Sequence, residues 1–389
     1  MKTHDDKAAQ DELAEWIRFA LTPVSPKRQL ELLAAFGLPG QVFAQSHSRL
    51  ASLAGTKTAE ALRTGPKPEA VEAALAWAAG DGNHLLTLAD AAYPKALLEI
   101  PDPPIALYVK GNPALLARPA LALVGSRTGT AQGEANAEAF ARSLGEAGLT
   151  IISGLALGID AAAHRGALET AGGTVAVLGT GIDRIYPAAN ESLTREIAAR
   201  GALVSEFPLG MPPARHHFPR RNRLIAGLAQ GVLVVEATLN SGSLITARLA
   251  LESGREVFAI PGSIHSPLAR GCHHLIREGA KLVETAEDVL EELRARLGNS
   301  LPPRPEKPRT RRAAPARRAS APPARLDLPP EACKVLEALG PEPRDIDSLA
   351  LATGLTVDAL NVHLLTLELE GLAARQPGGG FQRLHRPLL

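Results

Sequence analysis

The sequence predicts an α/β protein whose core is an extended Rossmann-like, doubly wound and mostly parallel sheet. From about residue 85 to 296, short apolar segments rich in Val, Ile and Leu alternate with helical segments of about 10 to 15 residues. Such strands are typical of parallel sheets that helices cover on both faces. A composition with 35 Gly and only 3% aromatic residues fits many tight strand–helix turns.

Seven segments have the length and composition of buried strands. They are Leu121–Gly125, Thr150–Ser153, Val175–Leu178, Leu203–Glu206, Val232–Glu236, Val257–Ile260 and Lys281–Val283. Ligands of doubly wound sheets bind at the carboxyl ends of the strands, so the turns after these segments form the candidate site.

We expect four parts in the chain: a helical domain over residues 1–84, the core over 85–296, a linker over 297–327 and a winged-helix domain over 328–389. The helical domain is SAM-like or similar to a helix–hairpin–helix. A helix–hairpin–helix needs glycine in its hairpin, and Ser25 stands there, which favours docking or dimerisation over DNA binding. Within the linker, residues 301–326 carry eight Arg or Lys against the single acid Glu306, and the Pro-rich composition predicts a disordered tether.

In the winged-helix segment, the expected recognition helix spans Thr356 to Glu370 and contains no Lys or Arg. Helices that read the major groove usually present Arg, Lys, Asn or Gln, and only Asn361 and His363 qualify in part. Weak duplex contact through Arg375, Arg383 and Arg386 of the wing and a protein-interaction role are equally open.

Cys272 and Cys333 are far apart in the sequence and fall in different parts of the chain, so no disulfide framework is implied. The N-terminus has acids where a signal peptide needs an apolar run, and no apolar stretch is long enough to span a bilayer. These observations predict a cytoplasmic protein without a membrane contact.

The first core strand runs into Gly125, Ser126 and Arg127 and then into a helix. Such a turn and the positive end of the helix point free N–H groups at one position, which suits an anion. Arg127 adds a guanidinium that can bind a phosphate with two hydrogen bonds. The spacing is not that of a dinucleotide fingerprint.

Similar turns of small residues follow other strands, so the sequence predicts a row of phosphate positions rather than one nucleotide site. A basic segment that precedes an apolar helix adds cations at the same edge. The candidate residues beyond the first turn are Gly154, Gly179, Thr180, Gly181, Asn190, Arg215, Phe218, Arg220, Arg221, Asn222, Arg223, Ser241, Gly242 and Ser243.

No catalytic set is evident. Asp160 and His164 lie four residues apart on one helix and could form an acid–base pair, but a local hydrogen bond is the more common role. Cys272 with neighbouring histidines matches no standard zinc spacing. We therefore expect no catalytic residue, no metal and no cofactor.

With these residues assembled, the core resembles the DNA-processing protein A family of bacteria, also named Smf. The resemblance extends from about residue 93 to 284. Its matching segments are GSR at 125–127, SGLALGIDAAAH at 153–164, TVAVLGTGIDRIYP at 174–187, SEFPLG at 205–210, FPRRNRLIAGL at 218–228, VEATLNSGSLITA at 235–247, FAIPG at 258–262 and GCHHLIREGA at 271–280.

The resemblance implies a homodimer that binds single-stranded DNA without sequence preference, protects incoming strands in natural transformation and loads the RecA recombinase, with single-strand binding protein as a further partner. It implies no enzymatic activity and makes Arg127 the principal phosphate ligand. One position departs from the family: many relatives place a cation after Tyr186 and Pro187, where this chain has Ala188. Scarce aromatic residues, with only Phe218 and Tyr186 nearby, predict binding dominated by phosphate charge and therefore sensitive to salt.

Two other functions stay open. A phosphoribohydrolase-like enzyme would need a catalytic acid at the helix start, where residues 238–247 contain none. A scaffold with incidental DNA binding would rely on the terminal domains.

Overall fold

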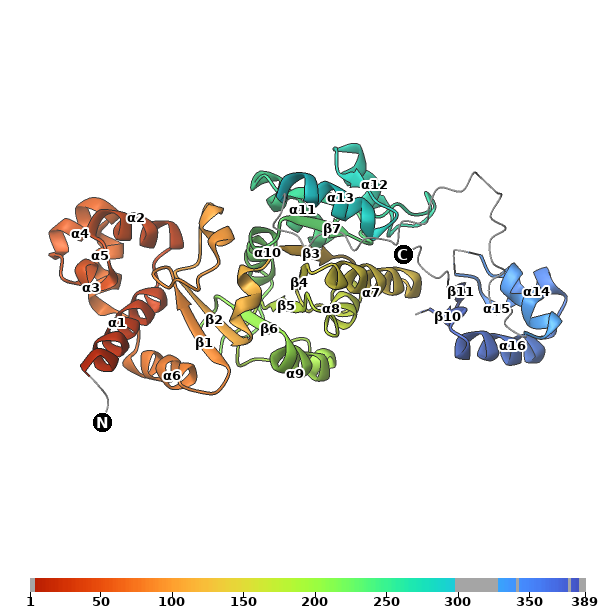
Figure 1. Cartoon of the computed structure of the whole chain (residues 1–389), viewed down its shortest axis with the longest axis horizontal. Helices are drawn as coiled ribbons and strands as arrows, with labels where there is room; N and C mark the ends of the chain where they lie inside the picture. The colour runs from red at the N-terminus through yellow and green to blue at the C-terminus, as the bar shows by residue number, and fades with distance from the viewer. Residues whose placement is uncertain (1–3, 298–327, 341–342, 377–378, 385–389) are drawn as a thin grey trace, which may run out of the picture.

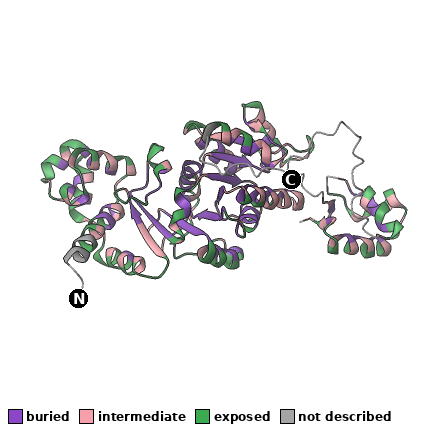
Figure 2. Cartoon of the chain, in the orientation of Figure 1, coloured by how far each residue is buried: buried purple, intermediate pink, exposed green. Residues whose placement is uncertain are grey.

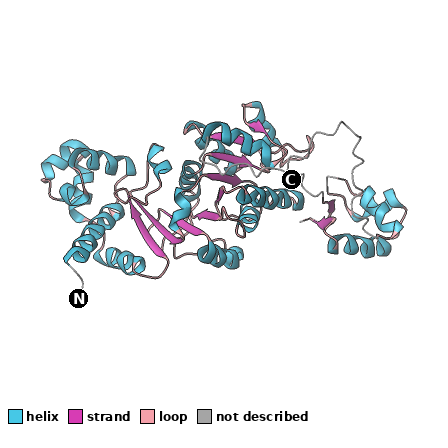
Figure 3. Ribbon diagram, viewed as in Figure 1, coloured by secondary structure: helices cyan, strands magenta, loops and turns pink. Residues whose placement is uncertain are grey.

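The computed structural model describes residues 4–297, 328–340, 343–376 and 379–384 (Figure 1). Its core is a nine-stranded sheet in the order β1-β2-β6-β5-β4-β3-β7-β8-β9. The strands are β1 (Asn83–Thr87), β2 (Ala106–Gly111), β3 (Ala120–Val124), β4 (Thr150–Ser153), β5 (Thr174–Val177), β6 (Ala202–Ser205), β7 (Gly231–Val234), β8 (Glu256–Ala259) and β9 (Lys281–Leu282). All pairs from β3 to β9 are parallel, which confirms the predicted fold class (Figure 3).

The sequence analysis missed β1 and β2, which extend the sheet beyond β6 with antiparallel pairing. β1 begins with the polar residues Asn83 and His84 and is only half-buried along most of its length, so it lacks the apolar run that marked the other strands. β2 connects the core to the N-terminal helices, where the rings of Trp77 and Tyr108 meet at 5.4 Å between centroids.

Helices cover both faces of the sheet, and the strands between them are buried (Figure 2). One face carries α7 (Ala131–Glu146), α8 (Ile159–Ala167), α9 (Glu191–Arg200) and α13 (Ala286–Leu297), and the other carries α10 (His217–Leu228), α11 (Gly242–Glu252) and α12 (Arg270–Arg277). Alternate residues of β3 serve the two layers: Ala122 and Val124 pack with α10 and α11, whereas Leu121 and Leu123 pack with α7 and α8. Three short 3₁₀ helices are η1 (Lys95–Glu99), η2 (Pro113–Ala117) and η3 (Ala188–Asn190).

The N-terminal part is helical, as expected, and packs around Trp16, Phe19 and Leu32. Its helices are α1 (His4–Leu21), α2 (Pro26–Phe36), α3 (Pro39–Phe43), α4 (His47–Ala54), α5 (Thr56–Thr64) and α6 (Pro68–Ala78). Ser25 caps α2 by accepting a hydrogen bond from the backbone N–H of Arg28 at 3.4 Å, which explains this residue without a DNA contact.

The C-terminal part is a winged helix with its own apolar core, centred on Leu349, Leu360 and Leu364. Its elements are α14 (Pro330–Ala338), α15 (Ile346–Thr353), α16 (Val357–Leu369), β10 (Ala373–Arg375) and β11 (Phe381–Arg383). The expected linker and Arg386 lie outside the described residues. Among the described helices none is long and apolar enough to cross a membrane alone; α15 and α16, bent by 103°, reach that length and composition only when taken together.

His164 joins α8 to the sheet from a fully buried position. Its Nδ1 lies 2.7 Å from the hydroxyl of Thr174, and that hydroxyl donates to the carbonyl of Ile151. The Thr174 hydroxyl must therefore accept from Nδ1–H, and the buried Nε2 has no hydrogen-bond partner among the described residues. Burial is the largest cause that lowers the pKa of His164, to about 3.

We predict that the free energy of unfolding falls by about 2 kcal/mol from pH 7 to pH 5 because of His164. The unfolded chain protonates this imidazole near its ordinary pKa, whereas the folded chain binds the proton only near pH 3, so acid favours unfolding across that window. Denaturant unfolding over this range measures the effect. His164→Gln should show a flatter pH dependence, and an unchanged slope would contradict the assignment.

Candidate nucleic-acid interface

The candidate site lies where the order of the strands reverses. After β3 the chain adds β4, β5 and β6 on one side, then crosses to add β7, β8 and β9 on the other. The carboxyl ends of β3 and β7 therefore diverge into different turns, which leaves a crevice between them. A groove of about 670 Å³ occupies this position.

Segments far apart in the sequence meet in this groove. Its lining comes from the turn after β3, the start of α10 and the turn before α11. The predicted residues in the lining are Gly125, Ser126, Arg127, Arg215, Phe218, Arg221, Asn222, Ser241, Gly242 and Ser243. The sequence analysis missed Thr128, Ile245 and Thr246, which also line it. None of these three residues is charged. Thr128 belongs to the turn after β3, and the position of α11 brings Ile245 and Thr246 to the groove.

Arg127 is exposed at the groove, and its guanidinium lies 5.4 Å from the ring centroid of Phe218. Phe218 in turn contacts Tyr186, with ring centroids 5.6 Å apart and planes tilted by 38°. Among the described residues, no ion pair involves Arg127 or the exposed Arg215. The groove therefore presents two uncompensated cations beside an aromatic pair.

The positive end of α7 is not open to a ligand, contrary to the sequence prediction. Glu236, two residues after β7, accepts hydrogen bonds from the N–H of Thr130 at 2.8 Å and from its hydroxyl at 2.7 Å. A side chain on Gly133 would collide with this carboxylate, which places it against the first turn of α7. The protein's own anion occupies the helix end, so the turn and Arg127 are left to bind a phosphate without it.

Arg221 lines the groove, although its residue is only 4% exposed. It donates to the carbonyl of Val177 at 3.0 Å, and its guanidinium packs so closely on Gly154 that any side chain there would collide with it. Burial lowers its pKa to about 10, partly opposed by the nearby Asp160 carboxylate, so the guanidinium stays charged at neutral pH. Arg221 therefore lines the groove as a largely buried charge that Val177 and Gly154 hold in place.

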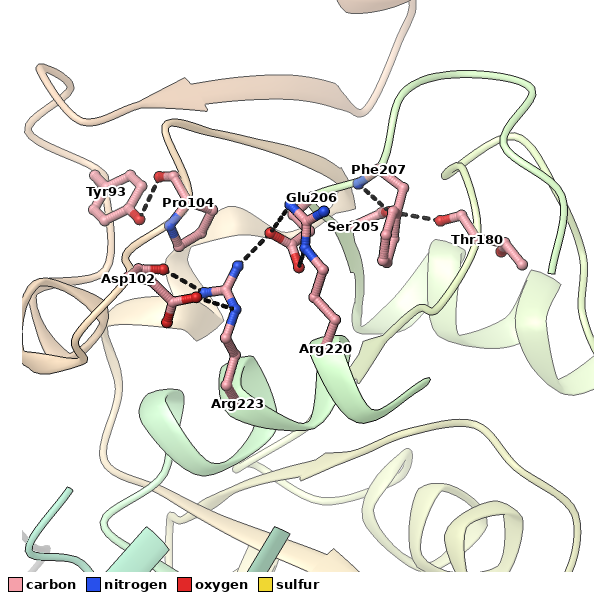
Figure 4. Close-up of polar contacts among 9 residues, drawn as sticks. All are labelled: Tyr93, Asp102, Pro104, Thr180, Ser205, Glu206, Phe207, Arg220 and Arg223. Atoms are coloured by element: carbon pink, nitrogen blue, oxygen red, sulfur yellow. Dashed lines mark hydrogen bonds and ion pairs between the residues drawn. The ribbon is translucent and has the colours of Figure 1, made fainter. Parts of the chain in front are cut away.

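Arg220 and Arg223 point away from the groove toward Glu206 (Figure 4). Glu206, whose side chain is 2% exposed, binds both Nε and Nη2 of Arg220 at 3.1 Å and also pairs with Arg223. Arg223 also donates to the backbone carbonyl of Asp102, which lies in the loop that follows η1. Two arginines of the basic segment, Arg220 and Arg223, thus hold α10 to the rest of the core and do not line the groove.

Other predicted residues serve the architecture around the groove. Gly154 and Gly179 line a cavity of about 90 Å³ that shares Arg127 and Phe218 with the groove. Thr180, Gly181 and Asn190 line neither space. The buried amide of Asn190 donates to the carbonyls of Leu155 and Ala156 at 2.9 and 3.2 Å. η3, which contains Ala188, likewise lies outside both linings.

Asp160 and His164 do not bind each other. The Asp160 carboxylate accepts from the N–H groups of Gly154 and Ala156 at 3.1 and 3.4 Å, so both the acid–base and the mutual hydrogen-bond interpretations are wrong. Burial raises the pKa of Asp160, opposed by Arg221 and these N–H groups. Among the described residues, no group of three His, Cys, Asp or Glu side chains has the geometry of a metal site.

Known families match both parts of the chain. DNA recombination-mediator protein A matches residues 84–294, and the DprA winged helix domain matches residues 319–379. Protein Smf of Escherichia coli K12 is 43% identical over 320 residues, which is 82% of each chain. The DNA processing protein DprA of Streptococcus pneumoniae is 52% identical over 206 residues, covering 53% of this chain and 73% of the relative.

Solved structures show the same fold. The X-ray structure of the Streptococcus pneumoniae DprA superposes with a TM-score of 0.63 at 38% identity, over 75% of this chain and 99% of the other. The Helicobacter pylori DNA processing protein A, whose single-stranded DNA binding mode was described, superposes with a TM-score of 0.50 at 32% identity. That match covers 55% of this chain and 96% of the other.

We predict that Arg221→Ala lowers the free energy of unfolding by about 3 kcal/mol, because it leaves Asp160 buried without its compensating charge. Adding Asp160→Asn should recover part of the loss. Arg127→Ala, at an exposed side chain, should change stability by less than about 0.5 kcal/mol. Chemical denaturation of the parent and the three variants measures these changes, and an Arg221→Ala protein as stable as the parent would refute the role.

Proposed function

The chain belongs to the DNA recombination-mediator protein A family, and on that premise we propose that it binds single-stranded DNA in the groove at the carboxyl ends of β3 and β7. The observation that carries the proposal is the exposed Arg127, free of ion pairs among the described residues and stacked on Phe218. Phosphates bind cations of this kind without regard to sequence. An aromatic pair beside them suits unpaired bases, since every base has a face that can stack.

The arrangement of groups along the groove also suits a polymer as the ligand. Phosphate-binding groups extend from Arg127 and Arg215 to the N-terminus of α11, where Ser241 and Ser243 share a hydrogen bond of 2.6 Å between their hydroxyls. The amide of Asn222 donates to the carbonyl of Gly242 at 3.3 Å and holds this turn against α10. The binding of the related Helicobacter pylori protein to single-stranded DNA supports the same assignment.

We predict that Arg127→Ala weakens binding of a labelled oligothymidine roughly tenfold to a hundredfold, as expected for one charge-assisted phosphate contact. The slope of log affinity against log salt should fall by about one phosphate contact. Fluorescence anisotropy across a salt series measures both quantities.

Arg195→Ala is the matched control for this experiment, because Arg195 is an exposed arginine of α9 that does not line the groove. Its affinity should equal that of the parent chain. Equal affinity of the Arg127→Ala protein across the salt series would overturn the assignment of the site. A mixed-sequence oligonucleotide bound much more weakly than oligothymidine would overturn the lack of sequence preference.

We further propose that the DNA-bound protein loads a RecA recombinase during transformation and recombination, as a homodimer and beside single-strand binding protein. The family's name as a recombination mediator supports this role. RecA filament growth on oligonucleotides coated with single-strand binding protein tests it. The parent chain should accelerate growth and Arg127→Ala should not, whereas equal acceleration by both would separate loading from the groove.

We propose that the protein has no enzymatic activity of its own. The two acids next to the groove are engaged: Asp160 accepts from backbone N–H groups, and Glu236 accepts from Thr130. A phosphoribohydrolase needs a carboxylate directed at the bound nucleotide. Incubation with nucleoside monophosphates should therefore release no free base, and turnover that Glu236→Gln abolishes would establish the enzyme instead.

A further inference from the structure

The helix of the winged helix that usually meets DNA is apolar on two opposite sides. The inner side of α16 packs Leu360, Leu364 and Leu367 into the domain core. The outer side exposes Val362 by 63%, Leu365 by 57% and Leu369 by 80%. The spacing of three and four residues places these side chains in one row along the helix, which we name the α16 stripe.

Nothing in the described part of the chain covers this stripe. α16 packs on α14, α15 and β10, and these contacts involve its inner side (Figure 1). Surface helices normally place polar residues opposite their core side, so a second apolar row has no role in the fold of the domain. Contiguous exposed apolar side chains of this kind mark a surface that binds another molecule.

The charges around the stripe exclude two occupants. α15 and α16 contain no Lys or Arg, while Asp358 lies in line with the stripe at its N-terminal end and Glu370 follows its C-terminal end. Duplex DNA would bring phosphates against these acids. A second copy of α16 would bring acids against acids whether the two helices ran parallel or antiparallel.

We propose that the α16 stripe is a docking site for a helical protein segment with a row of apolar side chains flanked by Lys or Arg. The apolar row would bury Val362, Leu365 and Leu369, and the basic flanks would pair with Asp358 and Glu370. Helix-in-groove and helix-on-helix recognition use such rows at positions i, i+3, i+4 and i+7. The site is separate from the groove that binds DNA, so one chain can hold both partners.

The test uses the full chain and two labelled helical peptides that share a leucine row and differ only in having Lys or Glu flanks. Fluorescence anisotropy should show binding of the Lys peptide. Val362→Ser, Leu365→Ser and Leu369→Ser together should weaken it about tenfold or more, since three apolar contacts are lost. Asp358→Lys with Glu370→Lys should exchange the preference toward the Glu peptide.

The matched control removes the same number of exposed apolar side chains elsewhere, with Leu53→Ser, Leu98→Ser and Ile264→Ser, and should bind as the parent does. Glu368 is left unchanged because its carboxylate accepts from the N–H of Arg375 at 2.9 Å. Circular dichroism checks that each variant keeps its helices.

Four outcomes would overturn the proposal. The first is undiminished binding of the Lys peptide by the serine variant, and the second is equal binding of the Glu peptide by the parent. The third is a parent oligomer that sedimentation shows to depend on the stripe, which would make a second copy the occupant. The fourth is tighter binding of a peptide of residues 301–326, or of a duplex oligonucleotide, that the serine substitutions abolish.

Discussion

The groove depends on one buried guanidinium group, that of Arg221. It touches Gly154 after β4, the carbonyl of Val177 at the end of β5 and the field of Asp160 in α8. A buried charge is costly unless it is paired and hydrogen-bonded, so the contacts with Val177 and Asp160 hold α10 in one position against the sheet. Phe218, one turn earlier on α10, is thereby held beside the turn after β3. The position of Phe218 at the groove therefore depends on the buried contacts of Arg221.

Carboxylates of the protein pair with some of the cations near the groove, so fewer cations remain to bind a ligand. Glu206 engages Arg220 and Arg223, and Glu236 occupies the end of α7 where a nucleotide phosphate would otherwise bind. Among the described residues that line the groove, Arg127 and Arg215 are exposed arginines without an ion pair. A site built this way favours a chain of phosphates that crosses the groove, because no single enclosed anion position remains. Because few cations would contact the ligand directly, the aromatic contact of Phe218 would contribute a larger share of the binding energy.

The two proposed binding surfaces have opposite chemistry. The groove combines cations with aromatic rings, whereas the α16 stripe combines leucines with acids. Nucleic acid is attracted to the first and repelled by the second. A chain with both surfaces can hold a DNA strand and a basic protein segment without competition between them. This arrangement suits a protein that brings a DNA-binding partner to DNA.

The parallel core and the winged helix could be predicted from the sequence, because strand composition and turn residues are local properties. Anion binding by the turn at Gly125 to Arg127 stays a prediction. The sequence analysis missed β1 and β2. β1 is a half-buried antiparallel edge strand without a continuous apolar run, whereas β2 is a buried strand that pairs antiparallel with both neighbours. The tertiary structure is needed to see where the three arginines between positions 220 and 223 lie and what they contact. They look alike along the chain, but helical geometry points them in different directions: Arg221 lines the groove, and the other two pair with Glu206. Burial and pairing depend on neighbours distant in sequence, which local patterns do not contain.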